Sequence, residues 1–402
     1  MTKVNKISVL SVLVFLLFPF GGFLLSLLNL SNKKRNNFSY FMISLFFAYI
    51  FIFIPPLGDL YRHYNLYQVV DFSQVHIDRA IFLYFYFLFM KWFDIPFYFA
   101  PFFVVFVSVY LLLKSFDYFI YLYKLNVKRK IYILYITVVL LNINYFVIAA
   151  GLRYMFAVSI MIFAFSHHIK NKNHIILFLN FLLACIIHFS IFYFIFPFLI
   201  SKCFKLSKKG FIIISIISIM LSHYSVVIFS LFVDYFNYGY SYISGRWAST
   251  EDRNLFGKLR AILNQMPFFL FLFIFILLDN RENDKVKNLI YWLIIFVLFT
   301  KFSFTIFVRY SVIPNFLMIF YILSTQKVEK IILQILLVFC SVYFIIDSVY
   351  GYRRQILFGE MWRPLYTSPL FFNFIKPDYD FYLTEVNSKG FWIKNPVADN
   401  NN

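Results

Sequence analysis

The chain has 402 residues, of which 62% are hydrophobic and only 14% are charged. A soluble domain of this length needs many more charged residues on its surface, so the composition excludes a soluble globular protein. The net charge of +19 does not indicate a nucleic-acid partner, because the basic residues are spread over short loops, where topology and anionic lipid explain them better. The three cysteines form no CxxC pair and predict neither a disulfide framework nor a metal site.

Apolar runs long enough to cross a bilayer recur along the whole chain. The first run is long enough to span and lacks a small-residue cleavage site, so we do not expect a signal peptide. We predict an all-α, multi-pass membrane protein with about 10–12 transmembrane or re-entrant helices. Spans are expected at residues 7–30, 38–57, 95–120, 129–147, 149–169, 210–233, 260–279, 287–305, 306–325 and 329–350.

Basic loops predict the orientation, because cytoplasmic loops carry an excess of lysine and arginine. Keeping all of them inside leaves the apolar segment 80–93 too short to cross, so it should dip in from outside or lie on the surface. Segment 174–200 has basic flanks at both ends, so it should enter the membrane and return, with its turn near His188 and Ser190. The same scheme puts the N-terminus outside, against the preference of Lys3 and Lys6. The loops in question contain Lys33–Arg35, Lys124–Lys130, Lys170 and Lys172, Lys202–Lys209, Lys285 and Lys287, and Lys327 and Lys330.

Most of the chain, residues 1–350, is predicted to form one transmembrane helical domain with long outer loops at 58–80 and 234–264. The aromatic-rich tail 351–402 is expected to fold as a cap at the outer face or to lie in the membrane interface. We find no internal repeat and no second soluble domain.

Arginine, unlike lysine, is concentrated on the outer side of this scheme. Positive-inside bias predicts the opposite, so the outer arginines require another cause. A phosphate partner suits a planar donor that is permanently charged. The residues are Arg62, Arg79, Arg153, Arg246, Arg253, Arg309, Arg353, Arg354 and Arg363.

Two ionisable residues stand out in the stretch 149–190. Arg153 lies where a helix is expected to begin, just after Gly151, so the free N–H groups of the helix and the guanidinium together favour an anion. The alternative is an interfacial arginine that snorkels to the headgroups. His188 lies in an apolar run and could act as a general base, or it could be a neutral histidine bonded to a carbonyl that the helix break exposes.

Asp59 and Arg309 complete the set of candidate catalytic residues. Asp59 follows Pro55 and Pro56 at the start of an outer loop, where it could deprotonate a sugar hydroxyl or hold an arginine in place. A solvated loop carboxylate is the alternative. Arg309 lies deep among apolar neighbours, which favours a functional role over a salt bridge to an outer acid.

Signatures for nucleotide, ATP or metal-dependent chemistry are missing from the sequence. We find no GxGxxG, Walker, HExxH, GxSxG or DxD-type motif, which argues against a soluble-donor transferase or an ATP-driven transporter. His167, His168 and His174 cluster in one inner loop, but their number and spacing do not predict a zinc site. No metal and no cofactor is expected.

Four short motifs resemble those of the Wzy-type polysaccharide polymerases, specifically the EpsG-like branch, and the resemblance covers most of the chain in order. Residues 363–369 also resemble the tail of that family. The motifs are Asp59-Leu60-Tyr61-Arg62-His63-Tyr64, Gly151-Leu152-Arg153 with Ala157 and Ile160, His188-Phe189-Ser190, and Arg309-Tyr310.

The resemblance implies a GT-C-like helical bundle with an outer-face cavity in the bacterial cytoplasmic membrane. It implies polymerisation of undecaprenyl-pyrophosphate-linked repeat units, with membrane lipid, a flippase and a chain-length regulator as partners and no nucleic acid. By analogy, Arg153 and Arg309 would hold the pyrophosphate, and His188 or Asp59 would accept the proton of the attacking hydroxyl. Further substrate contacts would come from Arg62, Tyr64, Arg79, Arg246, Tyr310 and Arg363.

Two other functions use the same donor. A flippase or transporter of the lipid-linked glycan would also need interior arginines, but it should show repeated halves in the sequence. A ligase would pass the glycan to a different acceptor. Both are kept as alternatives.

Overall fold

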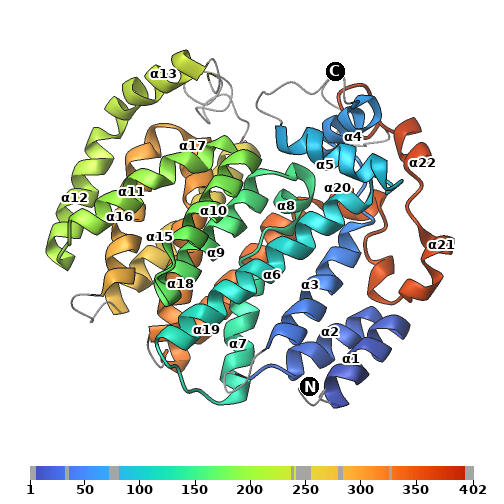
Figure 1. Ribbon diagram of the computed structural model, residues 1–402, viewed down its shortest axis with the longest axis horizontal. Helices are drawn as coiled ribbons and strands as arrows, with labels where there is room; N and C mark the ends of the chain where they lie inside the picture. The colour runs from blue at the N-terminus through green and yellow to red at the C-terminus, as the bar shows by residue number, and fades with distance from the viewer. Residues whose placement is uncertain are drawn as a thin grey trace. The chain divides into compact units, whose positions relative to one another are not determined.

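The computed structural model describes residues 6–31, 36–71, 81–236, 240, 255–278, 284–325 and 328–393. In these ranges every regular element is a helix, and the helices are joined by turns and loops that include an isolated β-bridge between Val386 and Trp392 (Figure 1). The chain divides into two compact units, unit 1 with Met1–Ser190 and Glu329–Asn402, and unit 2 with Ile191–Val328.

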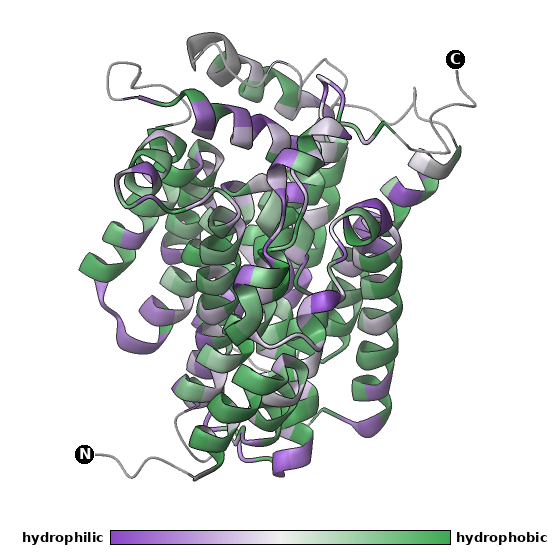
Figure 2. Ribbon diagram, turned by 90° about the vertical axis from the view of Figure 1, so that its right-hand side faces the viewer, coloured by the Kyte–Doolittle hydropathy of each residue, from purple (hydrophilic) through white to green (hydrophobic). Residues whose placement is uncertain are grey.

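The prediction of an all-α, multi-pass membrane protein is confirmed. Among the described residues, five helices are long and apolar enough to cross a membrane, or six if a bent helix pair counts as one span. Figure 2 shows hydrophobic residues along most of the helical ribbon, with hydrophilic residues more frequent toward helix ends and in the connecting segments. The five are Phe99–Leu122, Lys208–Leu231, Gly257–Leu278, Phe304–Thr325 and Lys330–Tyr350. The GT-C-like character of the bundle and the division at residue 350 stay predictions.

The predicted single span at 7–30 is wrong, because this run folds into a helical hairpin. Helix α1 (Lys6–Leu17) ends before Pro19, and α2 (Pro19–Leu28) packs back against it. Gly22 makes the close approach possible, since a Cβ there would lie 2.5 Å from the Cβ of Phe15. The Asn29 side chain after α2 donates to the hydroxyl of Ser8 near the start of α1 (3.4 Å). The chain therefore enters and leaves the hairpin at the same end.

The hairpin also places the start of α1 level with the start of α3. Asn29 bonds to Ser39 of α3 (Asn37–Phe51) as well, so the start of α1, the end of α2 and the start of α3 lie at one level. We call this end of unit 1 the inner end. Because α1 starts there, Lys6 begins its helix at the end of unit 1 where α2 ends, and not at the opposite end as a single span over 7–30 would require.

Long helices form the centre of unit 1. Helix α6 (Phe99–Leu122) packs against α3 on one side and against α9 (Tyr154–Asn171) on the other, and α10 (His174–Ile187) packs along α9. Helix α7 (Arg129–Leu141) contacts α19 (Lys330–Phe344), which continues as the π-helix η5 (Ile345–Tyr350).

A layer of short helices covers the opposite, outer end of unit 1. Helix α4 (Asp59–Val69) packs on α5 (Ile81–Trp92), where Lys91 donates to the carbonyls of Gln68 and Val70 at 2.9 Å each. Helix α5 has 12 residues, too few to cross a bilayer, as its sequence predicts.

The C-terminal segment 351–393 belongs to unit 1, and most of it lies at the outer end of that unit. It contains α20 (Arg353–Phe358), the 3-10 turns η6 (Arg363–Leu365) and η7 (Pro369–Phe371), α21 (Phe372–Ile375) and α22 (Tyr379–Thr384). The hydroxyl of Tyr379 donates to the carbonyl of Ile54 (3.0 Å), and the N–H of Gly58 donates to the carbonyl of Gly390 (2.9 Å). The segment is therefore a folded cap.

Unit 2 begins inside the segment that was expected to re-enter. Helix α10 ends at Ile187, and the chain continues through the 3-10 helix η2 (Phe189–Phe194) into α11 (Ile195–Cys203), so the predicted break at His188 is present. Helix α16 (Lys285–Phe299) packs against α11, α12 (Lys208–Met220) and α18 (Val312–Thr325). The remaining helices are α13 (Ser225–Phe236), α15 (Leu255–Leu278) and α17 (Phe304–Tyr310). Most of the predicted outer loop 234–264 lies outside the described residues.

Candidate functional site

A break between two helices places Arg153 at the start of α9. Helix α8 (Tyr145–Gly151) is followed by its C-cap residue Leu152, whose left-handed φ of 52° turns the chain, and Arg153 is the N-cap residue of α9. An arginine side chain has no hydrogen-bond acceptor, so it cannot cap the first N–H groups as serine or aspartate would. Apart from the neighbouring residues and the backbone of α8 itself, no heavy atom lies within 4 Å of the position of a Cβ on Gly151, so the break is open on that side. This start of α9 combines a helix dipole, a guanidinium and space for a ligand.

The far end of α8 is fixed by Asn144 and Asp347. The Asn144 side chain caps α8 by accepting from the N–H of Val147 (3.0 Å), and its amide group donates to the buried carboxylate of Asp347 in η5. A tethered α8 holds the break, and with it Arg153, in a defined place in unit 1.

His63 on α4 is the residue that joins this break to the outer layer. Helix α4 packs on α8, and the half-buried His63 ring makes a hydrogen bond with the backbone of Gly151. Burial, followed by the positive charge of Arg153, lowers the pKa of His63 from 6.5 to about 4, with a smaller contribution from Arg62 and an opposing one from the Gly151 bond. His63 is therefore neutral at pH 7, and both charges that act on it are positive.

His188 reaches the same helix start from α10. It is the C-cap residue of α10, with an extended backbone, and its ring meets the ring of Tyr154 edge-on at 5.1 Å. Its Nδ1 lies 2.7 Å from the hydroxyl of Ser190. Because Tyr154 directly follows Arg153, the structure brings His188 beside the residue that begins α9. We call Arg153, His63 and His188 the outer group.

Asp59 and Arg62 form an exposed ion pair on the first turn of α4. Gly58 precedes them with a φ of 60°, which a residue with a side chain would adopt only under strain. Two roles were predicted for Asp59, to accept a proton or to hold an arginine in place, and its ion pair with Arg62 fits the second. It therefore orients a guanidinium whose charge acts on His63.

The other predicted contacts of unit 1 lie in the cap and its neighbours. Tyr64 is half-buried and contacts the rings of Phe97 (5.3 Å) and Tyr379 (5.6 Å). Arg363 pairs with Glu360 at 2.5 Å. Arg79 and Arg246 lie outside the described residues.

Arg309 and Tyr310 end the short helix α17 of unit 2. Arg309 is half-buried, whereas Tyr310 is only 4% exposed. The Tyr310 ring stacks on Phe296 (5.7 Å) and meets Phe194 edge-on (5.1 Å). That Arg309 acts together with Arg153 stays a prediction.

In the part of the chain that the structure describes, no three histidine, cysteine, aspartate or glutamate side chains converge as a metal site would require. His168 and His174 do meet, with ring centroids 4.7 Å apart, at the start of α10.

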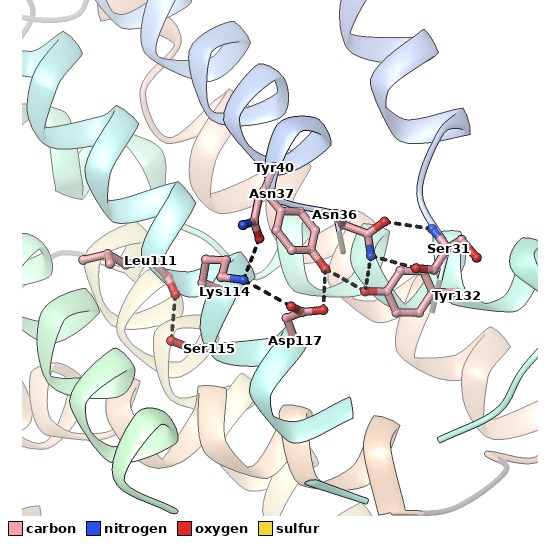
Figure 3. Close-up of polar contacts among 9 residues, drawn as sticks. All are labelled: Ser31, Asn36, Asn37, Tyr40, Leu111, Lys114, Ser115, Asp117 and Tyr132. Atoms are coloured by element: carbon pink, nitrogen blue, oxygen red, sulfur yellow. Dashed lines mark hydrogen bonds and ion pairs between the residues drawn. The ribbon is translucent and has the colours of Figure 1, made fainter. Parts of the chain in front are cut away.

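A second polar group, which the sequence had not indicated, lies at the inner end of unit 1 (Figure 3). The hydroxyls of Tyr40 and Tyr132 are 2.6 Å apart, and the Asn36 amide donates to Tyr132 (3.2 Å) and to the carbonyl of Ser31 (2.8 Å). These bonds join the loop after α2 to α3 and α7.

Helix α6 contributes an ion pair to the same group. Lys114 lies 3.2 Å from the carboxylate of Asp117 and donates to the side chain of Asn37 (2.8 Å), while Tyr40 reaches Asp117 at 3.5 Å. Each polar atom named has a partner and the two charges cancel, which is the pattern of a structural network. We call it the inner polar cluster: Asn36, Asn37, Tyr40, Lys114, Asp117 and Tyr132.

His63 is the residue of the outer group that sequence reasoning missed. It stands in the quoted motif of residues 59–64, and it follows Asp59 by four positions, so the two share one face of α4. Only the packing of α4 on α8 shows that it faces Arg153.

One known protein family matches most of this chain. Residues 58–357, well over half of the chain, match the sequence model of the EpsG family, and the match begins at the glycine that starts α4. No curated protein and no solved structure gives a significant match. The family match and the membrane-spanning helices indicate a membrane protein of polysaccharide biosynthesis. The chain belongs to the EpsG family.

Proposed function

We propose that this chain is a membrane glycosyltransferase. It polymerises undecaprenyl-pyrophosphate-linked oligosaccharide repeat units at the outer face of the bacterial cytoplasmic membrane. The observation that carries the proposal is the outer group, in which Arg153 begins an 18-residue helix beside two imidazoles.

The donor determines what such a site must bind. A glycan linked to undecaprenyl pyrophosphate presents two negative phosphates at the membrane surface, next to the glycosidic bond that breaks. Arg153, the N-terminus of α9 and the open side of Gly151 supply charge, N–H groups and room for these phosphates.

The transfer itself needs charge stabilisation and a proton acceptor. A hydroxyl at the non-reducing end of the acceptor attacks the anomeric carbon, and the bond from that carbon to the pyrophosphate oxygen breaks. The electron pair stays on the leaving undecaprenyl pyrophosphate, where Arg153 stabilises the developing charge. The hydroxyl proton passes to a base.

We assign the base role to His188 in preference to Asp59. The ring of His188 contacts Tyr154, which places it next to the proposed phosphate site, and Ser190 fixes its Nδ1. Asp59 is exposed and paired with Arg62, so it serves better as the residue that orients that arginine.

Unit 2 contributes Arg309 as a second phosphate contact in this proposal. Burial of Tyr310 between Phe194 and Phe296 supports a role for the tyrosine in fixing the end of α17. Arg62, Tyr64, Arg79, Arg246 and Arg363 remain proposed contacts to the glycan and its phosphates.

Reconstitution tests the activity directly. The purified protein in lipid vesicles, supplied with a synthetic undecaprenyl-pyrophosphate-linked repeat unit, should produce a ladder of longer glycans. It should release one undecaprenyl pyrophosphate per linkage formed. Absence of both products with correctly folded protein would overturn the proposal.

The alternatives give different outcomes in the same experiment. A flippase would move the repeat unit across the vesicle membrane without lengthening it. A ligase would release undecaprenyl pyrophosphate only when a different acceptor is added. In cells, Arg309→Ala should abolish long polymer while single repeat units still reach the surface. Glycan ladders of normal length in this variant would contradict the proposed role of Arg309 in binding phosphate.

A further inference from the structure

The C-terminal cap contains an apolar segment that extends toward the α1–α2 hairpin. Residues 364–375, PLYTSPLFFNFI, carry no charged side chain, and Arg363 and Lys376 flank them. Several of the side chains are widely exposed: Tyr366 59%, Leu370 65%, Phe371 58% and Phe374 87%. Large exposed apolar patches mark interaction sites, and flanking basic residues are typical of a segment that enters a membrane.

Two contacts fix how far this segment extends. The Ser368 hydroxyl donates to the backbone carbonyl of Leu16, one residue before the end of α1, and η7 packs on α1. The Tyr49 hydroxyl of α3 donates to the carbonyl of Thr367 (3.3 Å). Tyr49 also meets Phe15 of α1, with ring centroids 6.1 Å apart, so the segment reaches the tip of the hairpin.

The length of α1 indicates how deep in the bilayer the contact between Ser368 and Leu16 lies. Helix α1 has 12 residues, and at about 1.5 Å per residue it rises roughly 18 Å from the inner end. The hydrocarbon core of a bilayer is about 30 Å thick, so the tip of the hairpin lies near its middle. A segment that bonds to Leu16 therefore descends from the outer face to about the same depth, and Figure 1 shows α21 nearer to α1 than α22 is.

The backbone of the segment suits an apolar environment. Lipid offers no hydrogen bonds, so non-helical backbone at membrane depth must find its partners in the protein. The N–H groups of Leu365, Tyr366, Thr367 and Phe371 donate to backbone carbonyls within the segment or just before it. Ser368, at the contact with the hairpin, is only 7% exposed.

We infer that residues 364–375 form a loop that penetrates the outer leaflet, and that lipid acyl chains cover its exposed side chains. The surface continues onto the hairpin, where Leu13 (54% exposed), Leu17 (68%) and Phe18 (43%) belong to a run that the bilayer already covers. The α1–α2 hairpin from the inner side and residues 364–375 from the outer side thus each extend about halfway across the membrane, where the sequence predicts a single span. The inference does not depend on the proposed glycosyltransferase activity.

Tryptophan quenching in proteoliposomes tests the loop. Phe374→Trp adds a probe in the segment, and Phe391→Trp is the matched control at another exposed phenylalanine (59%), beside Lys389 and Gly390 of the outer end. Both exchanges place an aromatic ring at an exposed site, so the fold should tolerate them. The signal of each probe is its emission minus that of the unmodified chain.

Lipids brominated in the middle of their acyl chains should quench the Phe374→Trp probe at least twofold more strongly than the Phe391→Trp probe. Iodide in the aqueous phase should show the reverse order. Equal access of iodide to both probes would overturn the inference, because the segment would then lie in water. Protection of the Phe374→Trp probe from both quenchers would also overturn it, because protein rather than lipid would then cover the segment.

Discussion

Two polar groups lie at opposite ends of unit 1, and they differ in how their charges are balanced. In the inner polar cluster, Lys114 pairs with Asp117, and the surrounding hydroxyls and amides bond to one another (Figure 3). In the outer group, the charges that act on His63 are those of Arg153 and Arg62, and both are positive. A balanced network holds helices together, whereas a guanidinium at a helix N-terminus beside an open backbone position offers a binding site for an anion.

The comparison predicts opposite consequences for variants of the two groups. Loss of an outer residue should reduce turnover and leave the fold intact. Loss of an inner residue should reduce stability and leave the turnover of each folded molecule unchanged.

The largest effect is expected for Arg153→Ala. Removing one group that stabilises transition-state charge typically lowers turnover by about 10²–10³-fold. The release of undecaprenyl pyrophosphate by the purified variant measures this loss. Arg353→Ala, which removes an exposed arginine of α20, is the control and should keep normal turnover. Full activity of Arg153→Ala would exclude the phosphate role.

His188→Ala should come next, with a loss of about 10²-fold if His188 is the general base. The variant must be inserted and folded, which size-exclusion chromatography in detergent checks. Ser190→Ala, which removes the partner of Nδ1 but keeps the imidazole, should retain much of the activity. A His188→Ala protein that is lost from the membrane would show that the residue serves the helix break instead.

Asp117→Ala tests the inner polar cluster. It removes the partner of Lys114 and an acceptor of Tyr40, so the free energy of unfolding should fall by about 1–3 kcal/mol. Thermal unfolding in detergent measures the change. The comparison between the two groups fails if this variant instead loses turnover at unchanged stability.

His63→Gln should change the pH dependence of donor binding. The pKa of His63 is about 4 in the free protein, below its ordinary value of 6.5, so the ring is neutral before the donor binds. A bound pyrophosphate offsets the charge of Arg153 and raises that pKa, so donor binding takes up a proton at a pH between the pKa values of the free and the donor-bound protein. Affinity for the donor, a pyrophosphate diester without a group that titrates in this range, should therefore rise as the pH falls from 6.5 toward 4.

Glutamine cannot take up this proton, although it can keep a bond to the Gly151 backbone. The His63→Gln variant should therefore show a flat affinity over the same range, which binding titrations at several pH values would reveal. A slope identical to that of the unmodified protein would assign the proton to another group.

Sequence reasoning worked where one local signal was strong. The basic flanks of segment 174–200 predicted a break near His188, and the span expected at 149–169 placed Arg153 close to the start of a helix. The fold class followed from composition, and the short α5 from its length.

The rest depends on contacts between distant residues. The run 7–30 carries a local break signal in Pro19, Gly21 and Gly22, but this signal alone does not show that the chain folds back on itself. The hairpin depends on the close packing of Gly22 against Phe15, which is a tertiary contact. The inner polar cluster joins Asn36 to Tyr132 across 96 positions. His63 was visible in its motif, but its approach to Arg153 requires the packing of α4 on α8.

The central claim is that the start of α9 binds the pyrophosphate of the donor. The most direct test compares the affinity for undecaprenyl pyrophosphate of the unmodified protein, Arg153→Ala and Asp117→Ala in detergent at pH 7. We predict a dissociation constant at least tenfold higher for Arg153→Ala and an unchanged one for Asp117→Ala. Equal affinity in the unmodified protein and Arg153→Ala would contradict the claim.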